Sequence, residues 1–145
     1  MWRELIEGLT SEATFGEPAS DAAIEAIEVA LEQPVPDDLV SLLREVGEVR
    51  DKYLTDVVWT PEKIVAENRD FRTYPDFKDL YMPFEPLMFF GDTGDGSRFA
   101  FIRRPERPDV FVWDHESDGR WFVANDLADF LTRAFTATSD DWYQL

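Results

Sequence analysis

The chain has 145 residues, enough for one domain that buries about two-thirds of its unfolded surface. Its 31 acidic residues outnumber its 14 basic ones, so the net charge is −17, and it contains no cysteine. These counts exclude disulfides and cysteine-ligated metal sites, and they disfavour binding to nucleic acid phosphates or to acidic membrane surfaces.

The rest of the composition indicates a folded protein of the cell interior. Aromatic residues make up 14% of the chain, which supplies a large buried area and argues against disorder. The first ten residues alternate charged and apolar side chains, so they lack the apolar core of a signal peptide, and no apolar run reaches membrane-spanning length. Without cysteine, the reducing cytoplasm is the expected compartment.

Negative charge is concentrated in two segments. Residues 12–48 carry ten acidic side chains against one arginine, and residues 108–145 carry eight against two arginines, whereas residues 49–107 are nearly balanced. Such a field would speed the encounter with a basic partner. Alternatively, it serves only the solubility of the protein.

Three amphipathic helices are predicted in the first third of the chain, the first of them over Trp2–Leu9. Ser20 or Asp21 caps the second helix, which ends at the prolines that follow it. Pro36 lies in the first turn of the third helix, and Gly47 is its expected carboxyl cap. The apolar residues at helical spacing are Leu5, Ile6 and Leu9, then Ile24, Ile27 and Leu31, and then Leu39, Leu42, Leu43 and Val46.

The middle of the chain predicts a strand, a helix and a loop. Tyr53–Trp59 is rich in β-branched residues and predicts a strand. Thr60 and Pro61 supply a cap and a first-turn proline for a helix that runs to about Phe71. Residues 73–86 contain three prolines and four aromatic residues, so we expect an irregular loop that is pinned by its aromatic side chains.

One stretch in the second half carries the main strand signal. The runs Leu87–Phe90, Phe99–Ile102 and Val110–Trp113 are rich in strand formers and predict consecutive strands of one sheet. Residues 91–97 hold three glycines and predict a tight hairpin turn, and residues 103–108 predict a solvated connection. Because both alternating sets of the third run are apolar, that strand is expected to be central and covered on both faces.

The end of the chain predicts a short strand, Arg120–Val123, and a helix capped by Asn125. Trp142 and Tyr143 in the tail either dock on the domain or stay free. The last helix has its apolar residues at Leu127, Phe130, Leu131 and Ala134.

Taken together, these elements predict a single α+β domain over residues 1–145, with a mostly antiparallel sheet and helices packed against it.

Two groups of residues are candidates for chemistry. Asp92 and Asp95 on the glycine-rich loop could bind a hard cation, although turns recruit Asp and Gly for backbone reasons alone. His115, the single histidine, could act as a general base beside Asp114 and Glu116. Alternation along a strand turns these two neighbours to the opposite face, which argues against that role. Since common catalytic and phosphate-binding motifs are absent, we expect no enzyme activity, cofactor or metal.

Several segments match a known family in their order and spacing. They are IEAIEVAL, VPDDL, LLREVG, WTPEKIVAENRDFR, PLMFFGDTGDGSRFAF, VFVWDHE and LADFL, and they cover about residues 20–132. In this arrangement the chain resembles the SUKH superfamily, which includes a fungal regulator of cell-wall synthesis and many bacterial immunity proteins.

The resemblance implies a fold and a function. The family fold is a single α+β domain with a mostly antiparallel sheet, and bacterial members bind and block a toxin, often a nuclease, that neighbouring cells deliver. It therefore implies a non-catalytic inhibitor. The net charge of −17 adds the expectation of a basic protein partner and of no direct contact with nucleic acid or membrane. A monomer and a homodimer are equally compatible with the pattern.

Charge and turn placement suggest which residues contact the partner. Asp92, Asp95, Glu116 and Asp118 lie on connections that we expect to meet at one end of the sheet, where they would face a basic cleft of the toxin. Two alternatives stay open. One is an intracellular adaptor or regulatory binding module, and the other is a metal-dependent enzyme that uses Asp92, Asp95 and His115.

Overall fold

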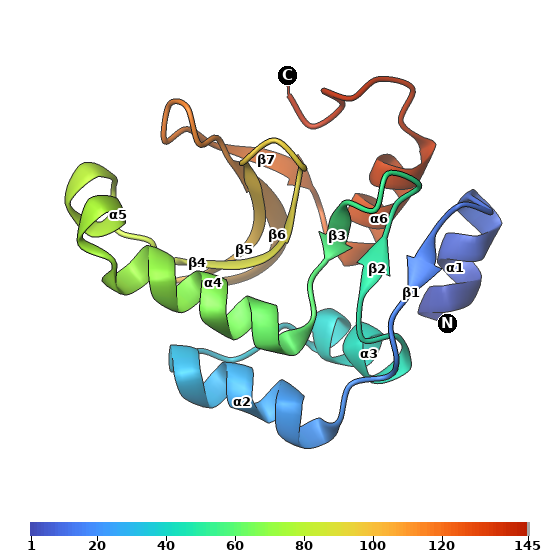
Figure 1. Ribbon diagram of the computed structural model, residues 1–145, viewed down its shortest axis with the longest axis horizontal. Coiled ribbons are helices and arrows are strands. Elements are labelled where there is room, and N and C mark those ends of the chain that lie inside the picture. The colour runs from blue at the N-terminus through green and yellow to red at the C-terminus, as the bar shows by residue number, and fades with distance from the viewer. Residues whose placement is uncertain (145) are drawn as a thin grey trace.

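A computed structural model describes residues 1–144 and shows one α+β domain, as predicted (Figure 1). None of the helices in this part of the chain is long and apolar enough to cross a membrane. The helices are α1 (Trp2–Leu9), α2 (Asp21–Leu31), α3 (Asp37–Glu45), α4 (Pro61–Thr73), α5 (Pro75–Leu80) and α6 (Leu127–Thr136). The strands are β1 (Thr14–Phe15), β2 (Val49–Arg50), β3 (Asp56–Val58), β4 (Leu87–Asp92), β5 (Arg98–Arg103), β6 (Glu106–Trp113) and β7 (Arg120–Ala124).

The strands form two antiparallel sheets. The larger sheet pairs β4, β5, β6 and β7 in chain order, as expected for strands that are joined by short turns. The smaller sheet pairs β1, β2 and β3. The two sheets meet where the chain leaves β3, because the backbone N–H of Trp59 donates to the carbonyl of Phe90 in β4 at 2.7 Å.

Aromatic side chains fill both faces of the larger sheet. On one face, Phe71 of α4 lies 5.0 Å from Phe89, measured between ring centroids. On the other face, Phe130 of α6 lies 5.3 Å from Phe90 and 4.7 Å from Phe99. The larger sheet is therefore packed between α4 and α6, with α2 on the far side of α4 (Figure 1).

β6 has the central position that its sequence predicts, between β5 and β7. The expectation that both of its faces are covered is wrong at Phe111, which is only partly buried. Its ring contacts Phe122 of β7, which is itself 40% exposed. Because β7 is the edge strand of the sheet, this corner is left open to solvent.

The tail after α6 docks on the domain, which settles the choice that the sequence left open. Trp142 stacks on Phe99 with 5.7 Å between ring centroids, and Tyr143 contacts the same ring edge-on. Tyr143 is 7% exposed, so its side chain belongs to the core.

The segment predicted as an irregular loop contains a helix, α5. This helix begins with Pro75 at its first position, where the missing N–H has no intrahelical partner to lose. The prediction is wrong because it treats each proline of the segment as a helix breaker. Its aromatic residues do pin the segment, since Phe77 stacks on Phe71 at 4.5 Å between ring centroids.

The sequence pattern does not predict most of the smaller sheet. β1 and β2 have two residues each, too few to show an alternating pattern. Tyr53–Thr55, predicted to begin a strand, instead forms a turn, and β3 starts at Asp56. In the larger sheet, β5 and β6 extend further than predicted, so the connection at 103–108 shrinks to a turn at Arg104 and Pro105.

Two helix caps are confirmed. Ser20 and Thr60 accept hydrogen bonds from the backbone N–H groups of Ala23 and Lys63, which satisfies donors in the first turns of α2 and α4. Pro36 differs from the prediction by one position, since it is the cap residue of α3 and not part of its first turn.

Two other caps are wrong. α3 ends at the extended residue Val46, and Gly47 serves a different purpose, because a Cβ there would lie 2.0 Å from the carbonyl oxygen of Glu17. Close approach of two backbones, and not a left-handed cap, requires this glycine. At α6 the capping side chain belongs to Asp126 and not to Asn125.

Candidate functional site

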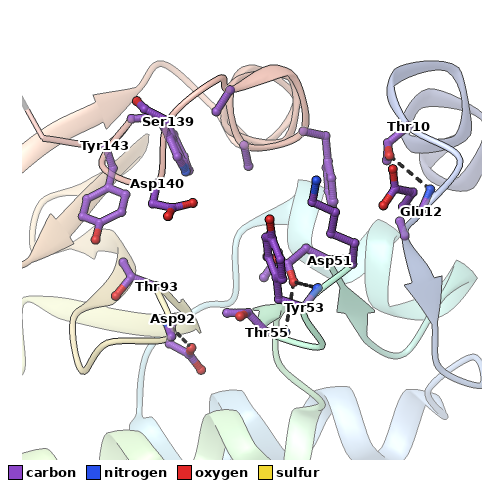
Figure 2. Close-up of a pocket in the computed structure, with 18 of the residues that line it drawn as sticks. Thr10, Glu12, Asp51, Tyr53, Thr55, Asp92, Thr93, Ser139, Asp140 and Tyr143 are labelled. Carbon is purple, nitrogen blue, oxygen red and sulfur yellow. Dashed lines mark hydrogen bonds between the residues drawn. The ribbon is translucent and has the colours of Figure 1, made fainter.

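A groove of about 780 Å³ opens where four segments meet (Figure 2). They are residues 10–13 before β1, the β2–β3 turn at 51–55, the β4–β5 turn at 92–95, and residues 134–143 around the end of α6. The two turns touch, since a Cβ on Gly94 would lie 3.1 Å from the Thr55 hydroxyl oxygen. The groove therefore unites parts of the chain that are far apart in sequence.

Acidic side chains dominate the ionisable lining of this groove. Lys52 is the one basic residue among its lining residues. In the view of Figure 2, the ring of Tyr53 lies between the carboxylates of Asp140 and Glu12. A recess with this charge attracts cationic groups and repels phosphates. The five acidic lining residues are Glu12, Asp51, Asp92, Asp95 and Asp140.

Asp92, one of the predicted contact residues, lines the groove but is bound from within the domain. Its Oδ2 accepts a hydrogen bond from Trp59 Nε1 at 2.8 Å, and its Oδ1 accepts one from the backbone N–H of Gly94 at 2.9 Å. Lys63 Nζ lies 3.8 Å from Oδ2. The carboxylate therefore fixes the turn, and its negative charge is partly compensated.

Asp95 also lines the groove and is also engaged. It accepts hydrogen bonds from the hydroxyl groups of Thr93 and Tyr143 and from the backbone N–H of Ser97. These bonds, the one from Thr93 foremost, outweigh burial and lower the pKa of the Asp95 carboxyl, while burial raises the pKa of Tyr143. Asp95 is therefore ionised at neutral pH and ties the tail to the β4–β5 turn.

The other two predicted contact residues lie on the β6–β7 connection. Glu116 is 80% exposed, so its carboxylate is free to meet a partner. Asp118 is held in place, because it accepts hydrogen bonds from Trp113 Nε1 at 2.7 Å and from the backbone N–H of Met82 at 3.0 Å. Burial acts to raise the pKa of Asp118, but these bonds and the charge of Arg120 outweigh it, so the pKa is lowered.

Asp118→Asn is expected to reduce the free energy of unfolding by about 1–2 kcal/mol at pH 7. The change replaces one carboxylate oxygen by an NH₂ group, which cannot accept the hydrogen bond that the Trp113 indole or the Met82 N–H donates. Aspartate and asparagine both tolerate the left-handed backbone at this position (φ 59°), so the change isolates the carboxylate. The lowered pKa means that the stabilisation is present above the unfolded value of about 4 and disappears as the pH falls through the folded value. Urea unfolding of both proteins at pH 7 and at pH 3 measures the difference, which should shrink at pH 3.

His115 joins the two turns that carry the predicted contact residues. Its Nδ1 lies 3.0 Å from Ser97 Oγ at the end of the β4–β5 turn. The expected separation from its acidic neighbours is wrong, since carboxylate oxygens of Asp114 and Glu116 lie 4.0 Å from the ring nitrogens. The reason is that β6 ends at Trp113 and the residues after it follow a turn, where strand alternation no longer applies.

The arrangement of the acidic groups suits binding better than metal chemistry. Within residues 1–144, no group of three or more His, Asp or Glu side chains is placed to hold a metal ion. Asp92 and Asp95 direct their oxygens at neighbouring N–H and O–H donors, which is how aspartates close glycine-rich turns. What the groove offers is a set of negative charges in a recess.

Sequence reasoning missed several residues of the groove, namely Asp51, Tyr53 and Asp140. Asp51 and Tyr53 were not predicted to form a turn beside the groove, because Tyr53 and the residues after it favour a strand. Asp51 itself could have indicated the turn, since an aspartate side chain readily accepts a hydrogen bond from the backbone N–H two residues later and so favours turns. For Asp140 the sequence carries no signal, because its place depends on how the tail docks.

Comparison with known proteins places most of the chain in one family. A family model described as SMI1-KNR4 cell-wall (SUKH_6) matches residues 21–131. Among curated proteins, no significant match is found. The matched region holds both turns of the groove, whereas residues 10–13 and 134–143, which form its other walls, lie outside that region.

Proposed function

Since the chain belongs to the SMI1-KNR4 cell-wall family of SUKH domains, we propose that it is an immunity protein that binds and neutralises a cognate bacterial toxin. The toxin is a basic domain, most simply a nuclease, whose positive cleft is occluded by the acidic groove. The protein acts in the cytoplasm by binding alone and needs no catalytic group, cofactor or metal.

The observation that carries this proposal is the charge of the groove. Five carboxylates and one lysine line a recess of about 780 Å³, on a chain whose net charge is −17. A nuclease binds phosphates with basic side chains, so an acidic recess is complementary to its active cleft. The overall field adds long-range attraction, which raises the association rate at low ionic strength.

The four contact residues inferred from the sequence take different parts in this proposal. Asp92 and Asp95 contribute charge to the groove while they hold its turn together. Glu116 is an exposed contact at the neighbouring turn. Asp118 acts indirectly, because its hydrogen bonds fix the conformation of that second turn.

The deciding experiment measures binding to the carboxyl-terminal domain encoded by the gene immediately upstream, at low and at high salt. We expect nanomolar affinity that weakens as salt rises, together with loss of the domain's toxic activity. Glu12→Lys combined with Asp140→Lys should weaken binding about 10-fold or more at low salt, because both side chains line the groove and neither accepts a hydrogen bond within the described residues.

The matched control is Glu25→Lys combined with Glu28→Lys on the exposed face of α2. Both double variants raise the net charge of −17 by four units, so they differ in the position of the charge and not in its amount. Equal losses of affinity in the two variants would show that only the overall field matters. Absence of binding by the unmodified protein would instead favour a regulatory binding module with another partner.

A further inference from the structure

The β2–β3 turn, which forms one wall of the groove, presents two large apolar side chains to solvent. Tyr53 is 70% exposed and Leu54 is 65% exposed. The ring of Tyr53 lines the groove, with Lys52 Nζ 5.2 Å from its centroid. Adjacent exposed apolar residues are an unfavourable arrangement for a free domain, and they are typical of residues that become buried in an interface.

The backbone holds this pair in a fixed position. Asp51 Oδ1 accepts hydrogen bonds from the N–H groups of Tyr53 at 2.9 Å and Thr55 at 3.1 Å. The carbonyl of Asp51 accepts another from the N–H of Leu54 at 3.0 Å. A turn that is already ordered loses little conformational entropy when it binds, so its side chains are prepared for contact.

Leu54 occupies a backbone conformation that suits glycine better. Its φ of 64° lies in the left-handed region, which a leucine side chain disfavours. This side chain is 65% exposed and does not pack against the hydrophobic core. A strained residue with an exposed apolar side chain is explained if that side chain is used outside the domain.

We propose that Tyr53 and Leu54 are the apolar anchor of the interface, and that the partner is a protein with an apolar pocket bordered by lysine or arginine side chains. This inference rests on the proposed function and adds the surface chemistry of the toxin. The pocket receives the two side chains of the turn, and the basic border faces the carboxylates of the adjoining groove. Charge complementarity fixes the orientation, and the buried apolar area supplies most of the affinity.

The test uses the full chain and the same upstream-encoded toxin domain, with Kd measured at low and high salt for Tyr53→Ala and Leu54→Gly. Each variant should weaken binding about 30-fold or more at both salt concentrations, since an apolar anchor is not screened by ions. Tyr74→Ala, which removes an equally large exposed ring between α4 and α5, outside the groove, should bind like the unmodified protein.

Thermal unfolding separates loss of the anchor from loss of the fold. Because glycine adopts the backbone of residue 54 without strain, Leu54→Gly should keep or raise Tm while it weakens binding. Unchanged affinity in both anchor variants, beside tight binding of the unmodified protein, would overturn the anchor and leave the immunity function standing. Loss of affinity in Tyr74→Ala alone would place the interface at the junction of α4 and α5. Absence of binding by the unmodified protein would overturn the function and the anchor together.

Discussion

Gly91→Ala is expected to lower the free energy of unfolding by about 3 kcal/mol, because the new methyl group would collide with the backbone of the neighbouring sheet. A Cβ on Gly91 would lie 2.0 Å from the carbonyl oxygen of Val57 and 2.9 Å from its carbonyl carbon. Backbone atoms cannot rotate away as the end of a side chain can, so β3 and β4 would have to separate.

The consequences should reach the groove as well as the fold. Separation of β3 from β4 would lengthen the hydrogen bond between the Trp59 N–H and the Phe90 carbonyl. It would also displace the Trp59 indole, which donates to Asp92 at the edge of the groove. Gly91→Ala should therefore weaken binding to the proposed toxin partner even under conditions where it remains folded.

Gly8→Ala in α1 is the matched control, since a Cβ there would meet no atom within 4 Å. It should raise the free energy of unfolding by up to about 1 kcal/mol, because alanine is favoured over glycine within helices. Urea unfolding of the two variants beside the unmodified protein makes the comparison. A Gly91→Ala protein as stable as the unmodified one would show that the junction of the two sheets can adjust.

The sequence predicts those parts of the fold whose residues act locally. Ser20 and Thr60 cap helices through atoms three residues away, and the strand runs of the larger sheet are long enough to show their pattern. Gly47 and Gly91 are different, because their requirement comes from the backbones of Glu17 and Val57, which are distant in sequence. No local pattern can indicate which chain segment will pass so close.

The candidate site is predicted less completely for the same reason. Asp92 and Asp95 stand out because aspartate and glycine mark their turn. The groove also needs the docked tail with Asp140 and the turn with Tyr53, and both depend on tertiary packing. Net charge indicated an acidic surface, but only the structure shows which acidic side chains share one recess.

Asn68→Ala is expected to cost about 3 kcal/mol of unfolding free energy, because it leaves two backbone groups of β4 buried without partners. Asn68 is 1% exposed. Its Oδ1 accepts from the N–H of Phe89 at 2.8 Å, and its Nδ2 donates to the Phe89 carbonyl at 2.9 Å. The side-chain amide thus takes the place of a neighbouring strand, and it links α4 to the larger sheet.

Asn125→Ala serves as the control in urea unfolding, because Asn125 is exposed and its side chain donates only a long hydrogen bond of 3.4 Å to Asp129. Its effect should stay within about 0.5 kcal/mol, as for most surface positions. Similar losses in the two variants would contradict the bridging role of Asn68.

Asn68→Asp tests the same bridge through its pH dependence. The introduced carboxylate could still accept from the Phe89 N–H, but it would face the Phe89 carbonyl without a proton to donate. Burial and that carbonyl both favour the protonated acid, so its pKa should be higher in the folded state than in the unfolded chain. The folded state then binds the proton more tightly, and stability is lost as the pH rises through the folded pKa. Unfolding measured at pH 5 and pH 8 should therefore show a larger deficit at pH 8. Ionisation of the introduced acid destabilises the fold, whereas ionisation of Asp118, whose carboxylate accepts hydrogen bonds from its donors, stabilises it.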